Sequence, residues 1–262
     1  MPRLIRRLLL LSIVCAGGAF GQAQVAGTFA QIAYGGNWQT TFTLVNLDSM
    51  DIANVTLNFF MDGPTTGPLT VPVQGFGNTS SYTFTIPVSG STNVVLSSTD
   101  PNVAQGWASM TVNAGNVQGQ GSFRFLLPGG QISEAVVPLS PAPSACIIGF
   151  PVTPGSVPTI LIPFDNTTGQ NFYFTSIAIA NISGGPLSVP IEFDDQSNTK
   201  LVTDTLTLAA NQHMAFLTTK NYTALVGKKG ILRISQSTSN VTVLGLLSNA
   251  SGAITTIIPI TQ

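Results

Sequence analysis

The sequence predicts an all-β protein in which two antiparallel β-sandwich domains follow one another behind a signal peptide. Three observations lead to this prediction: apolar and polar residues alternate, turn-forming residues recur at short intervals, and the second half of the chain repeats the first. Alternation with a period of two is typical of a half-buried strand, because successive side chains point to opposite faces. The sequence has no long stretch with the 3.6-residue period of a helix.

The alternation is clearest in the segment 187–194, where every second residue is apolar. Segments 82–86 and 205–208 repeat it, with threonine on the face that we expect to be wet. Pro190 has no backbone N–H to donate, so we expect its strand to be an edge strand or to carry a bulge there. The side chains predicted to point inward in the first segment are Leu187, Val189, Ile191 and Phe193.

The internal repeat defines the predicted domains. Two copies of roughly 100 residues each indicate two domains rather than a short-period solenoid. We place the signal peptide at residues 1–23, domain 1 at 24–140, a proline-rich linker at 141–158 and domain 2 at 159–262. The matching segments, in order, are 38–46 with 173–181, 55–59 with 189–193, 82–87 with 204–209, 106–107 with 230–231, 116–117 with 240–241, 121 with 245, and 136–139 with 257–260.

Turn signals separate the predicted strands. Gly129-Gly130 lies between two apolar runs and predicts a hairpin, and segment 249–252 holds the corresponding position in the second copy. Several short strands per copy, with turn signals every 8–12 residues or so, are typical of an antiparallel sandwich of immunoglobulin-like build.

Three motifs carry a family resemblance: the start Gly36-Asn37-Trp38-Gln39-Thr40-Thr41, the strand end Leu44-Val45-Asn46 and the step Gly106-Trp107. They resemble exported bacterial tandem immunoglobulin-like β-sandwich repeat proteins of unknown function. The resemblance implies export and fold, and it implies no site residue. The second copy departs from the pattern, with Tyr173 in place of Trp38 and Ile231 in place of Trp107.

The N-terminus has the three parts of a secretory signal. A basic region with Arg3, Arg6 and Arg7 precedes the apolar run 8–16, and small residues offer cleavage before Gln22 or Gln24. The apolar run is too short to span a bilayer, so we expect no membrane span in the mature chain. The predicted location is secreted, either periplasmic or extracellular.

Charge excludes one class of partner. The chain has 9 Lys+Arg and 10 Asp+Glu, and cleavage of the signal removes three of the arginines. Charged residues make up only 7% of the chain, against about 25% in ordinary soluble domains. Nucleic acid is therefore an unsuitable partner, since its phosphates require clustered positive charge.

Cysteine usage predicts no intramolecular disulfide in the mature chain, because Cys15 leaves with the signal and Cys146 remains alone. The apolar neighbours of Cys146 favour burial, and pairing between chains is the alternative.

Catalytic groups are sparse. The one histidine, His213, follows Asn211-Gln212 in a turn, where we expect it to be exposed. A nucleophilic triad needs a base beside its nucleophile, and a zinc site needs three or four ligands; neither set is visible. We therefore predict no enzymatic activity and no cofactor.

The densest acidic cluster contains Glu192, Asp194 and Asp195, with Asp204 nearby. Carboxylate oxygens suit calcium, so the first three are a candidate calcium site. A solvated strand edge that resists edge-to-edge pairing accounts for the same charges, and a paired-carboxylate hydrolase is the third reading.

Aromatic residues supply the candidate ligand site. Trp107 is out of phase with its apolar neighbours Ala108 and Met110, so it lies on the outer face, either exposed or covered by a loop or the other domain. Phe60 is out of phase in the same way and lies beside it in this prediction. Exposed rings in this arrangement would stack on a sugar. Trp38 is in phase with the core residues of its strand, and we expect it to cap the core.

Function is predicted by class. The leading hypothesis is a secreted, non-enzymatic structural, adhesive or interaction protein. The alternative is a carbohydrate-binding protein of the cell surface or medium, with its site on an aromatic face or between the domains. A third class is an envelope or fibre subunit that assembles through the final segment 257–262. Polysaccharides and other envelope proteins are the expected partners.

Overall fold

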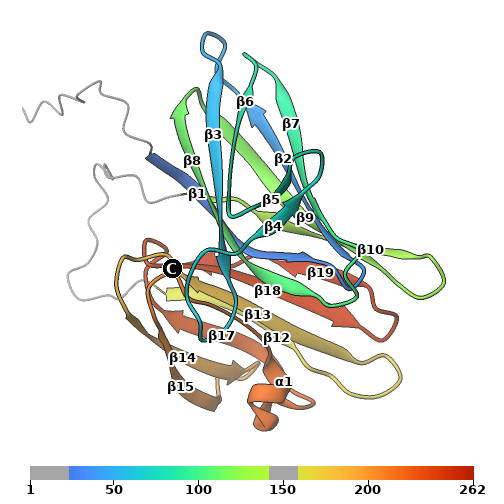
Figure 1. The fold of residues 1–262 in the computed structure, drawn as a ribbon. Helices are drawn as coiled ribbons and strands as arrows, with labels where there is room; N and C mark the ends of the chain where they lie inside the picture. The colour runs from blue at the N-terminus through green and yellow to red at the C-terminus, as the bar shows by residue number, and fades with distance from the viewer. Residues whose placement is uncertain (1–23, 142–158) are drawn as a thin grey trace, which may run out of the picture.

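The computed structural model describes residues 24–141 and 159–262, here named the N-terminal half and the C-terminal half. The predictions for the signal peptide 1–23, for Cys15 and Cys146, and for the linker beyond Pro141 fall outside the described residues. Both halves consist of antiparallel β-strands, so the predicted all-β fold class is confirmed. Figure 1 shows the N-terminal half, in blue to green, above the C-terminal half, in yellow to red.

The described strands of the N-terminal half form two sheets. One sheet has the strand order β11-β1-β8-β3-β6, and the other has the order β10-β9-β2-β7-β4-β5. The strands are β1 (Gln24–Tyr34), β2 (Trp38–Asn46), β3 (Ala53–Met61), β4 (Val71–Val73), β5 (Gly77–Thr79), β6 (Ser81–Ile86), β7 (Ser91–Ser97), β8 (Ala104–Ala114), β9 (Val117–Leu126), β10 (Ile132–Pro138) and β11 (Ser140–Pro141).

The described strands of the C-terminal half also form two sheets, with the orders β15-β14-β17-β12-β20 and β16-β13-β18-β19. A short helix, α1 (Thr218–Asn221), and a 3-10 turn, η1 (Thr223–Leu225), connect β16 to β17. The strands are β12 (Thr159–Asp165), β13 (Tyr173–Asn181), β14 (Leu187–Asp195), β15 (Lys200–Leu208), β16 (His213–Leu217), β17 (Lys229–Ser235), β18 (Val241–Asn249), β19 (Ile254–Ile257) and β20 (Ile260–Thr261).

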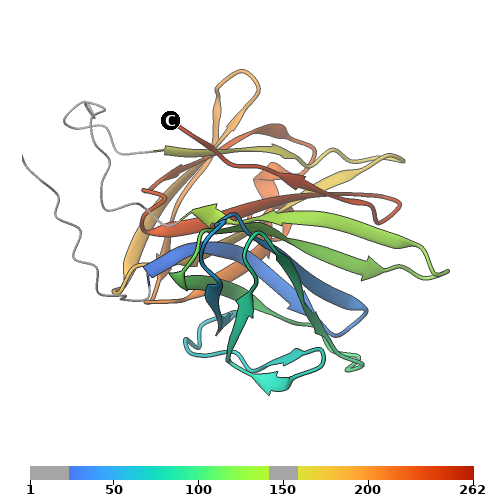
Figure 2. The same ribbon diagram turned by 90° about the horizontal axis from the view of Figure 1, so that it is seen from above.

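The strand orders of the two halves correspond. Strands β12, β17, β14, β15 and β20 hold the places that β1, β8, β3, β6 and β11 hold in the N-terminal half. In the second pair of sheets, β13, β16, β18 and β19 correspond to β2, β7, β9 and β10. The halves differ in the hairpin β4–β5, present in the first, and in the α1–η1 connection, present in the second. Figure 2 shows the β4–β5 hairpin projecting from the teal end of the N-terminal half.

The predicted alternation and both predicted hairpins are confirmed. On β14, Val189, Ile191 and Phe193 are fully buried, while Leu187 is half-buried at the start of the strand. Strands β9 and β10 pair across Gly129-Gly130, and β18 and β19 pair across segment 250–253. Apolar side chains from facing sheets therefore meet in the interior of each half, as period-two strands require.

One prediction about strand position needs correction. Strand β14 is not an edge strand, because it lies between β15 and β17. Pro190 pairs with Thr205 on β15, whereas the pairing of β14 with β17 begins only at Ile191. Pro190 is thus paired with β15 only. Because no described strand pairs with its other side, a residue without a backbone N–H can be accommodated inside the sheet. A bulge does occur in this strand, between Phe193 and Asp194.

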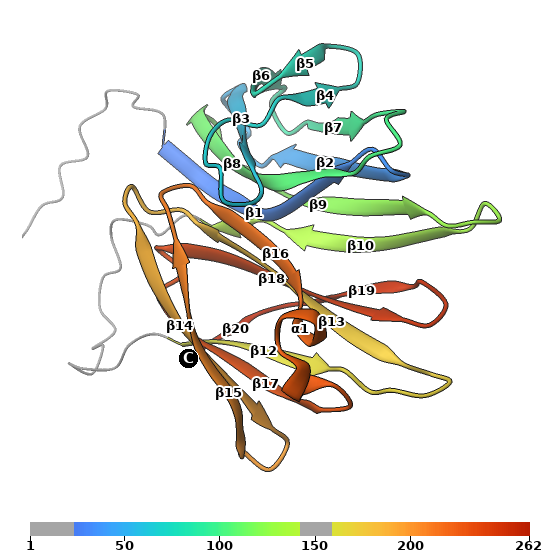
Figure 3. The same cartoon turned by 60° about the horizontal axis from the view of Figure 1, so that its bottom comes forward.

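The halves are packed against each other. Strand β19 runs beside β10, where the Ile254 N–H donates to Ser133 Oγ at 2.8 Å and Thr256 Oγ1 donates to the Val136 carbonyl. Strand β1 faces β13 and β18, whose Ala178 and Leu244 are part of the hydrophobic cluster of the N-terminal half. Figure 3 shows these layers in contact along β1, β10, β18 and β19.

Candidate functional site

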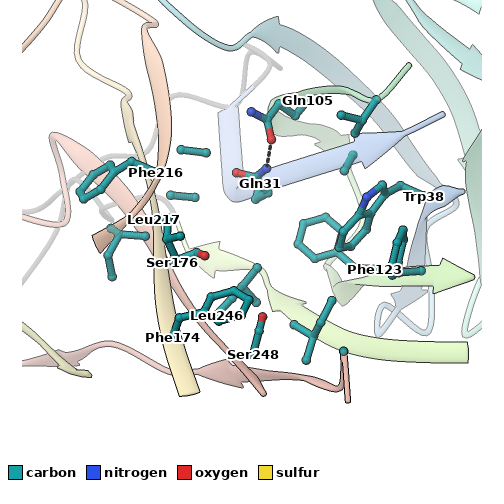
Figure 4. Close-up of a pocket in the computed structure, with 18 residues that line it drawn as sticks. Gln31, Trp38, Gln105, Phe123, Phe174, Ser176, Phe216, Leu217, Leu246 and Ser248 are labelled. Carbon is teal, nitrogen blue, oxygen red and sulfur yellow. Dashed lines mark hydrogen bonds between the residues drawn. The ribbon is translucent and has the colours of Figure 1, made fainter. Parts of the chain in front are cut away.

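A cavity of about 420 Å³ lies at the junction of the two halves. Strands β1, β2, β8 and β9 form one wall, and β13, β16, β18 and β19 form the other. Small-molecule sites typically have volumes of about 300–1,000 Å³ and occur preferentially between domains. Size and position both make this cavity the first candidate for a ligand site (Figure 4).

The cavity wall is largely hydrocarbon. On the N-terminal side, Trp38 stacks on Phe125, with ring centroids 4.5 Å apart, and meets the edge of Phe123 at 6.0 Å. Phe174, Phe216 and Leu246 line the opposite side (Figure 4). The described residues that line the cavity are all uncharged. Such a wall favours an apolar ligand, because burying it releases water from hydrocarbon surface.

A chain of four hydrogen-bonded polar side chains leads away from the cavity. Gln31 and Gln105 line the cavity, and the Gln31 Nε2 donates to Gln105 Oε1 at 3.2 Å. The Gln105 Nε2 donates to Asp62 Oδ2 at 2.7 Å, and Asp62 Oδ1 lies 2.7 Å from His213 Nδ1. The chain crosses the junction, since the first three residues belong to the N-terminal half and His213 to the C-terminal half.

The carboxylate of Asp62 fixes the direction of the two amides. Partial burial raises the pKa of Asp62, but the hydrogen bond and charge of His213 and the amide of Gln105 hold it below its usual value. An ionised carboxylate only accepts, so Gln105 turns its NH₂ group to Asp62 and its oxygen to Gln31. Gln31 must then donate to Gln105 through its NH₂ group, so the Gln31 side-chain oxygen points away from Gln105.

That oxygen is the unusual atom of the cavity. Gln31 is 6% exposed, and its Oε1 has no hydrogen-bond partner among the described residues. In Figure 4 it points away from Gln105, toward the side of Phe216. An unpaired buried acceptor is costly, by about 1–3 kcal/mol, so a donor delivered by a ligand would relieve it.

The prediction for His213 was wrong. The imidazole is fully buried rather than exposed in a turn. The loop that follows β3 covers it: Asp62 binds Nδ1, and the Gly63 N–H donates to the His213 carbonyl at 3.1 Å. The Nε2 has no partner in the part of the chain that the structure describes, so no described nucleophile lies within hydrogen-bonding distance of it. His213 therefore links the C-terminal half to the N-terminal half. The sequence does not indicate this contact, because Asp62 is 151 positions away.

The candidate calcium residues are each engaged separately. Glu192 pairs with Lys200 at 2.5 Å, and Asp195 Oδ1 accepts the N–H groups of Ser197 and Thr199, each at 2.8 Å. Asp194 is only 4% exposed, and Arg233 Nε lies 2.6 Å from its Oδ2. Residues 24–141 and 159–262 contain no group of three or more His, Cys, Asp or Glu side chains arranged to hold a metal ion.

Trp107 and Phe60 do lie side by side, as cross-strand neighbours on β8 and β3. Their rings stack with centroids 4.2 Å apart and planes 15° from parallel. The C-terminal half covers the pair: Trp107 is 2% exposed, and its Nε1 donates to the Asn211 carbonyl at 3.0 Å. With the halves packed in this way, Trp107 offers no open ring face to a sugar, and its indole instead joins the two halves.

Sequence reasoning missed Gln31, Gln105 and Asp62. A signal was present for Gln31, which interrupts the otherwise apolar run 29–34 of β1. Buried amides are retained in apolar strands when they have a partner or a ligand to bind. Trp38, which we expected to cap the core, is partly buried and lines the cavity.

Comparison with known proteins gives no relative: no protein-family model, no curated protein and no solved structure matches the chain. Among the described residues, none of the helices has the length and hydrophobicity needed to cross a membrane.

Proposed function

We propose that the chain is an exported, non-enzymatic binding protein made of two tandem immunoglobulin-like β-sandwiches, with its ligand site in the cavity at their junction. The observation that carries this proposal is the apolar cavity of about 420 Å³ that both halves line. A cavity with walls from both copies exists only when the copies are packed together. The need for such a cavity would therefore explain why the domain is present twice.

The tandem arrangement is supported by the strand orders. Each half places five strands in one sheet in corresponding order, and four strands of the other sheet also correspond. The segments that match in sequence lie on strands in corresponding places, such as 38–46 on β2 and 173–181 on β13. Two facing antiparallel sheets per half, with most connections crossing from one sheet to the other, agree with an immunoglobulin-like sandwich.

A binding role is favoured over catalysis by the groups that face the cavity. Hydrocarbon side chains, amides and hydroxyls orient a ligand, whereas nucleophilic catalysis requires a nucleophile within reach of a base. His213 has its Nδ1 occupied by Asp62 and is not among the residues that line the cavity.

The ligand class follows from the wall and the one unpaired acceptor. An apolar molecule of modest size fits the hydrocarbon surface, and a single hydroxyl or N–H group on it would donate to Gln31 Oε1. A saccharide fits less well, since it would bring several hydroxyls to a wall with few polar partners.

The test compares two probes that differ in one hydrogen-bond donor. We expect the purified exported protein to bind 1-naphthol about tenfold more tightly than 1-methoxynaphthalene, as judged by quenching of Trp38 fluorescence. Gln31→Met should remove this preference, and Ser248→Phe, which fills the cavity, should remove binding of both probes. Ser91→Phe, on an exposed strand position away from the cavity, is the control. Binding that survives Ser248→Phe would overturn the proposal.

A second candidate function is assembly through the final strand. Strand β20 is an edge strand, and Ile258 and Ile260 beside and within it are 69% and 56% exposed. Exposed edges with apolar side chains can pair with another chain. Light scattering at high protein concentration tests it, because a protein that stays monomeric would exclude this role.

A further inference from the structure

A second cleft lies in the C-terminal half, on the loop that joins β12 to β13. Its volume is about 340 Å³, and it is more open than the junction cavity, with which it shares Phe174 and Leu217 as walls. The loop 166–172 forms one side, and residues around α1 and η1 form the other. The described residues that line it are all uncharged and include the hydroxyls of Thr167, Thr168 and Thr219.

Asn166 forms the buried base of this cleft and is held firmly. Its backbone N–H donates to the Lys228 carbonyl at 2.9 Å, and its own carbonyl accepts the Gly227 N–H at 2.8 Å. Its side-chain oxygen accepts the Thr175 N–H and the Thr218 hydroxyl, both at 3.0 Å. Because a backbone N–H can only donate, the Asn166 oxygen must face Thr175 and the NH₂ group must face the other way.

That NH₂ group has no acceptor. Asn166 is 1% exposed, and its Nδ2 has no hydrogen-bond partner among the described residues. Two donors are therefore buried at the base of an open cleft in a side chain that cannot turn to satisfy them. Native proteins leave few such groups unpaired, and each one suggests a water molecule or a ligand.

An aromatic platform borders the cleft. Phe172 and Phe174 lie two residues apart on one side of the chain, and their rings stack with centroids 6.2 Å apart and planes 22° from parallel. Phe172 is 40% exposed, so one ring face is open to solvent while its partner holds it in place. The neighbouring Tyr173 is 37% exposed and also lines the cleft.

We infer that this cleft binds a neutral saccharide, with Asn166 Nδ2 donating to one of its oxygens and Phe172 stacking on the apolar face of its ring. A sugar ring combines an apolar face with acceptor oxygens and hydroxyls around its rim, which is the combination that this cleft complements. The uncharged lining argues against phosphorylated or acidic sugars, whose recognition uses arginine or lysine. Although the two sites share Phe174 and Leu217, the residues that carry this inference, Asn166 and Phe172, do not line the junction cavity.

The experiment uses the full exported protein, labelled with ¹⁵N, and a panel of neutral methyl glycosides and their disaccharides. We expect at least one glycoside to shift the Asn166 side-chain NH₂ resonances, which report directly on the atom that the inference concerns. Phe172→Ala should weaken that binding by about tenfold, since it removes an aromatic contact from an exposed position without disturbing the core. Phe76→Ala is the matched control, because Phe76 is an exposed phenylalanine of the N-terminal half, 62% exposed.

A second variant addresses Asn166 directly. Asn166→Asp keeps the oxygen that accepts from Thr175 and replaces the NH₂ group by an acceptor, so a variant that remains folded should lose binding. If no glycoside shifts the Asn166 NH₂ resonances, or if Phe172→Ala and Phe76→Ala weaken binding equally, the inference is wrong. Glycoside binding that perturbs Trp38 and Phe125 instead would place the saccharide in the junction cavity. That result would overturn this inference while leaving the junction site intact.

Discussion

The two halves share a frame and differ in the connection between their first two strands. In the N-terminal half, residues 35–37 make a tight turn in which all three have positive φ. In the C-terminal half, residues 166–172 form a longer loop that builds the saccharide cleft. Tyr34, which precedes the tight turn, donates its hydroxyl to the Thr70 carbonyl at 2.8 Å, whereas Asn166, the first residue of the long loop, has an NH₂ group with no partner among the described residues. The strand frame is thus common to both halves, and the candidate binding chemistry lies where they diverge.

The frame itself is held by the same polar anchors in each half. Asn46 and Asn181, at the ends of β2 and β13, are fully buried and each contact three carbonyl oxygens, at 2.8 to 3.4 Å and 2.8 to 3.2 Å respectively. Thr40 and Thr175, six residues before them, each accept from and donate to one backbone residue of the preceding strand. The same buried side chains therefore fix the same strand ends and connections in both halves.

Another difference shows how burial decides which residues occupy corresponding positions. Phe60 and Trp107 form an aromatic stack on the sheet face of the N-terminal half that the C-terminal half covers. The corresponding cross-strand pair in the C-terminal half is Asp194 and Ile231, and Arg233 binds the aspartate there. A face covered by the other half suits stacked rings, whereas at the corresponding place of the C-terminal half the partly exposed Arg233 pairs with the buried Asp194.

The largest expected effect tests the shared anchors. Asn46→Ala and Asn181→Ala should each lower the free energy of unfolding by about 3 kcal/mol, because each substitution leaves several buried carbonyls and N–H groups without a partner. Chemical denaturation followed by circular dichroism measures both losses. Asn54→Ala, at an exposed position on β3, is the control and should change stability little. A large loss in one half and none in the other would contradict the view that the anchors are equivalent.

The second-largest expected effect tests whether Trp107 holds the two halves together. Trp107→Ile introduces the residue found at the corresponding position of the C-terminal half, and it removes both the stack on Phe60 and the donor to the Asn211 carbonyl. We expect a loss of about 2 kcal/mol in the free energy of unfolding. Hydrogen exchange should speed up at the amides near Asn211 and His213. Ile231→Val is the control, and unchanged exchange in Trp107→Ile would show that the indole does not hold the halves together.

Much of the frame could be predicted from the sequence, because its determinants are local. Alternation places Val189, Ile191 and Phe193 inward whatever lies opposite them, and Gly129-Gly130 makes its hairpin with adjacent residues. The burial of His213 and Trp107 depends instead on contacts with Asp62 and Asn211, which are more than 100 positions away in sequence. Surfaces that two halves bury against each other carry no periodic signal that distinguishes them from exposed faces.

The candidate sites were harder to predict for the same reason. The junction cavity takes its walls from eight strands of both halves, so neither half alone contains it. The position of Pro190 illustrates a different limit: a missing donor indicates that one side of a residue is unpaired, but it does not place the whole strand at an edge.

A smaller effect, with a defined pH dependence, sharpens the role of the polar chain at the junction. The pKa of Asp62 is below its usual value in the folded protein, so its contribution to stability is present above the ordinary pKa of an aspartate and is lost as the pH falls through the folded pKa. Asp62→Asn should cost about 1 kcal/mol at neutral pH, because this carboxylate is partly exposed and screened. Below pH ~4 the difference between wild type and variant should shrink. Denaturation curves at both pH values measure it, and a difference that grows on acidification would contradict the assignment.

The smallest expected effect concerns the acidic strand of the C-terminal half. Asp194 and Glu192 are each bound to a cation of the protein itself, Arg233 and Lys200, and Asp195 caps its own turn. A calcium ion would have to displace these partners to collect the six to eight oxygens that it requires. We therefore expect calcium to leave the melting temperature unchanged, and Lys200→Ala to alter the free energy of unfolding by less than about 0.5 kcal/mol, since that pair is exposed. Differential scanning calorimetry with calcium and then with a chelator checks the first expectation. A clear calcium-dependent rise that Asp195→Asn removes would restore the metal site and would give the C-terminal half a third feature that its counterpart lacks.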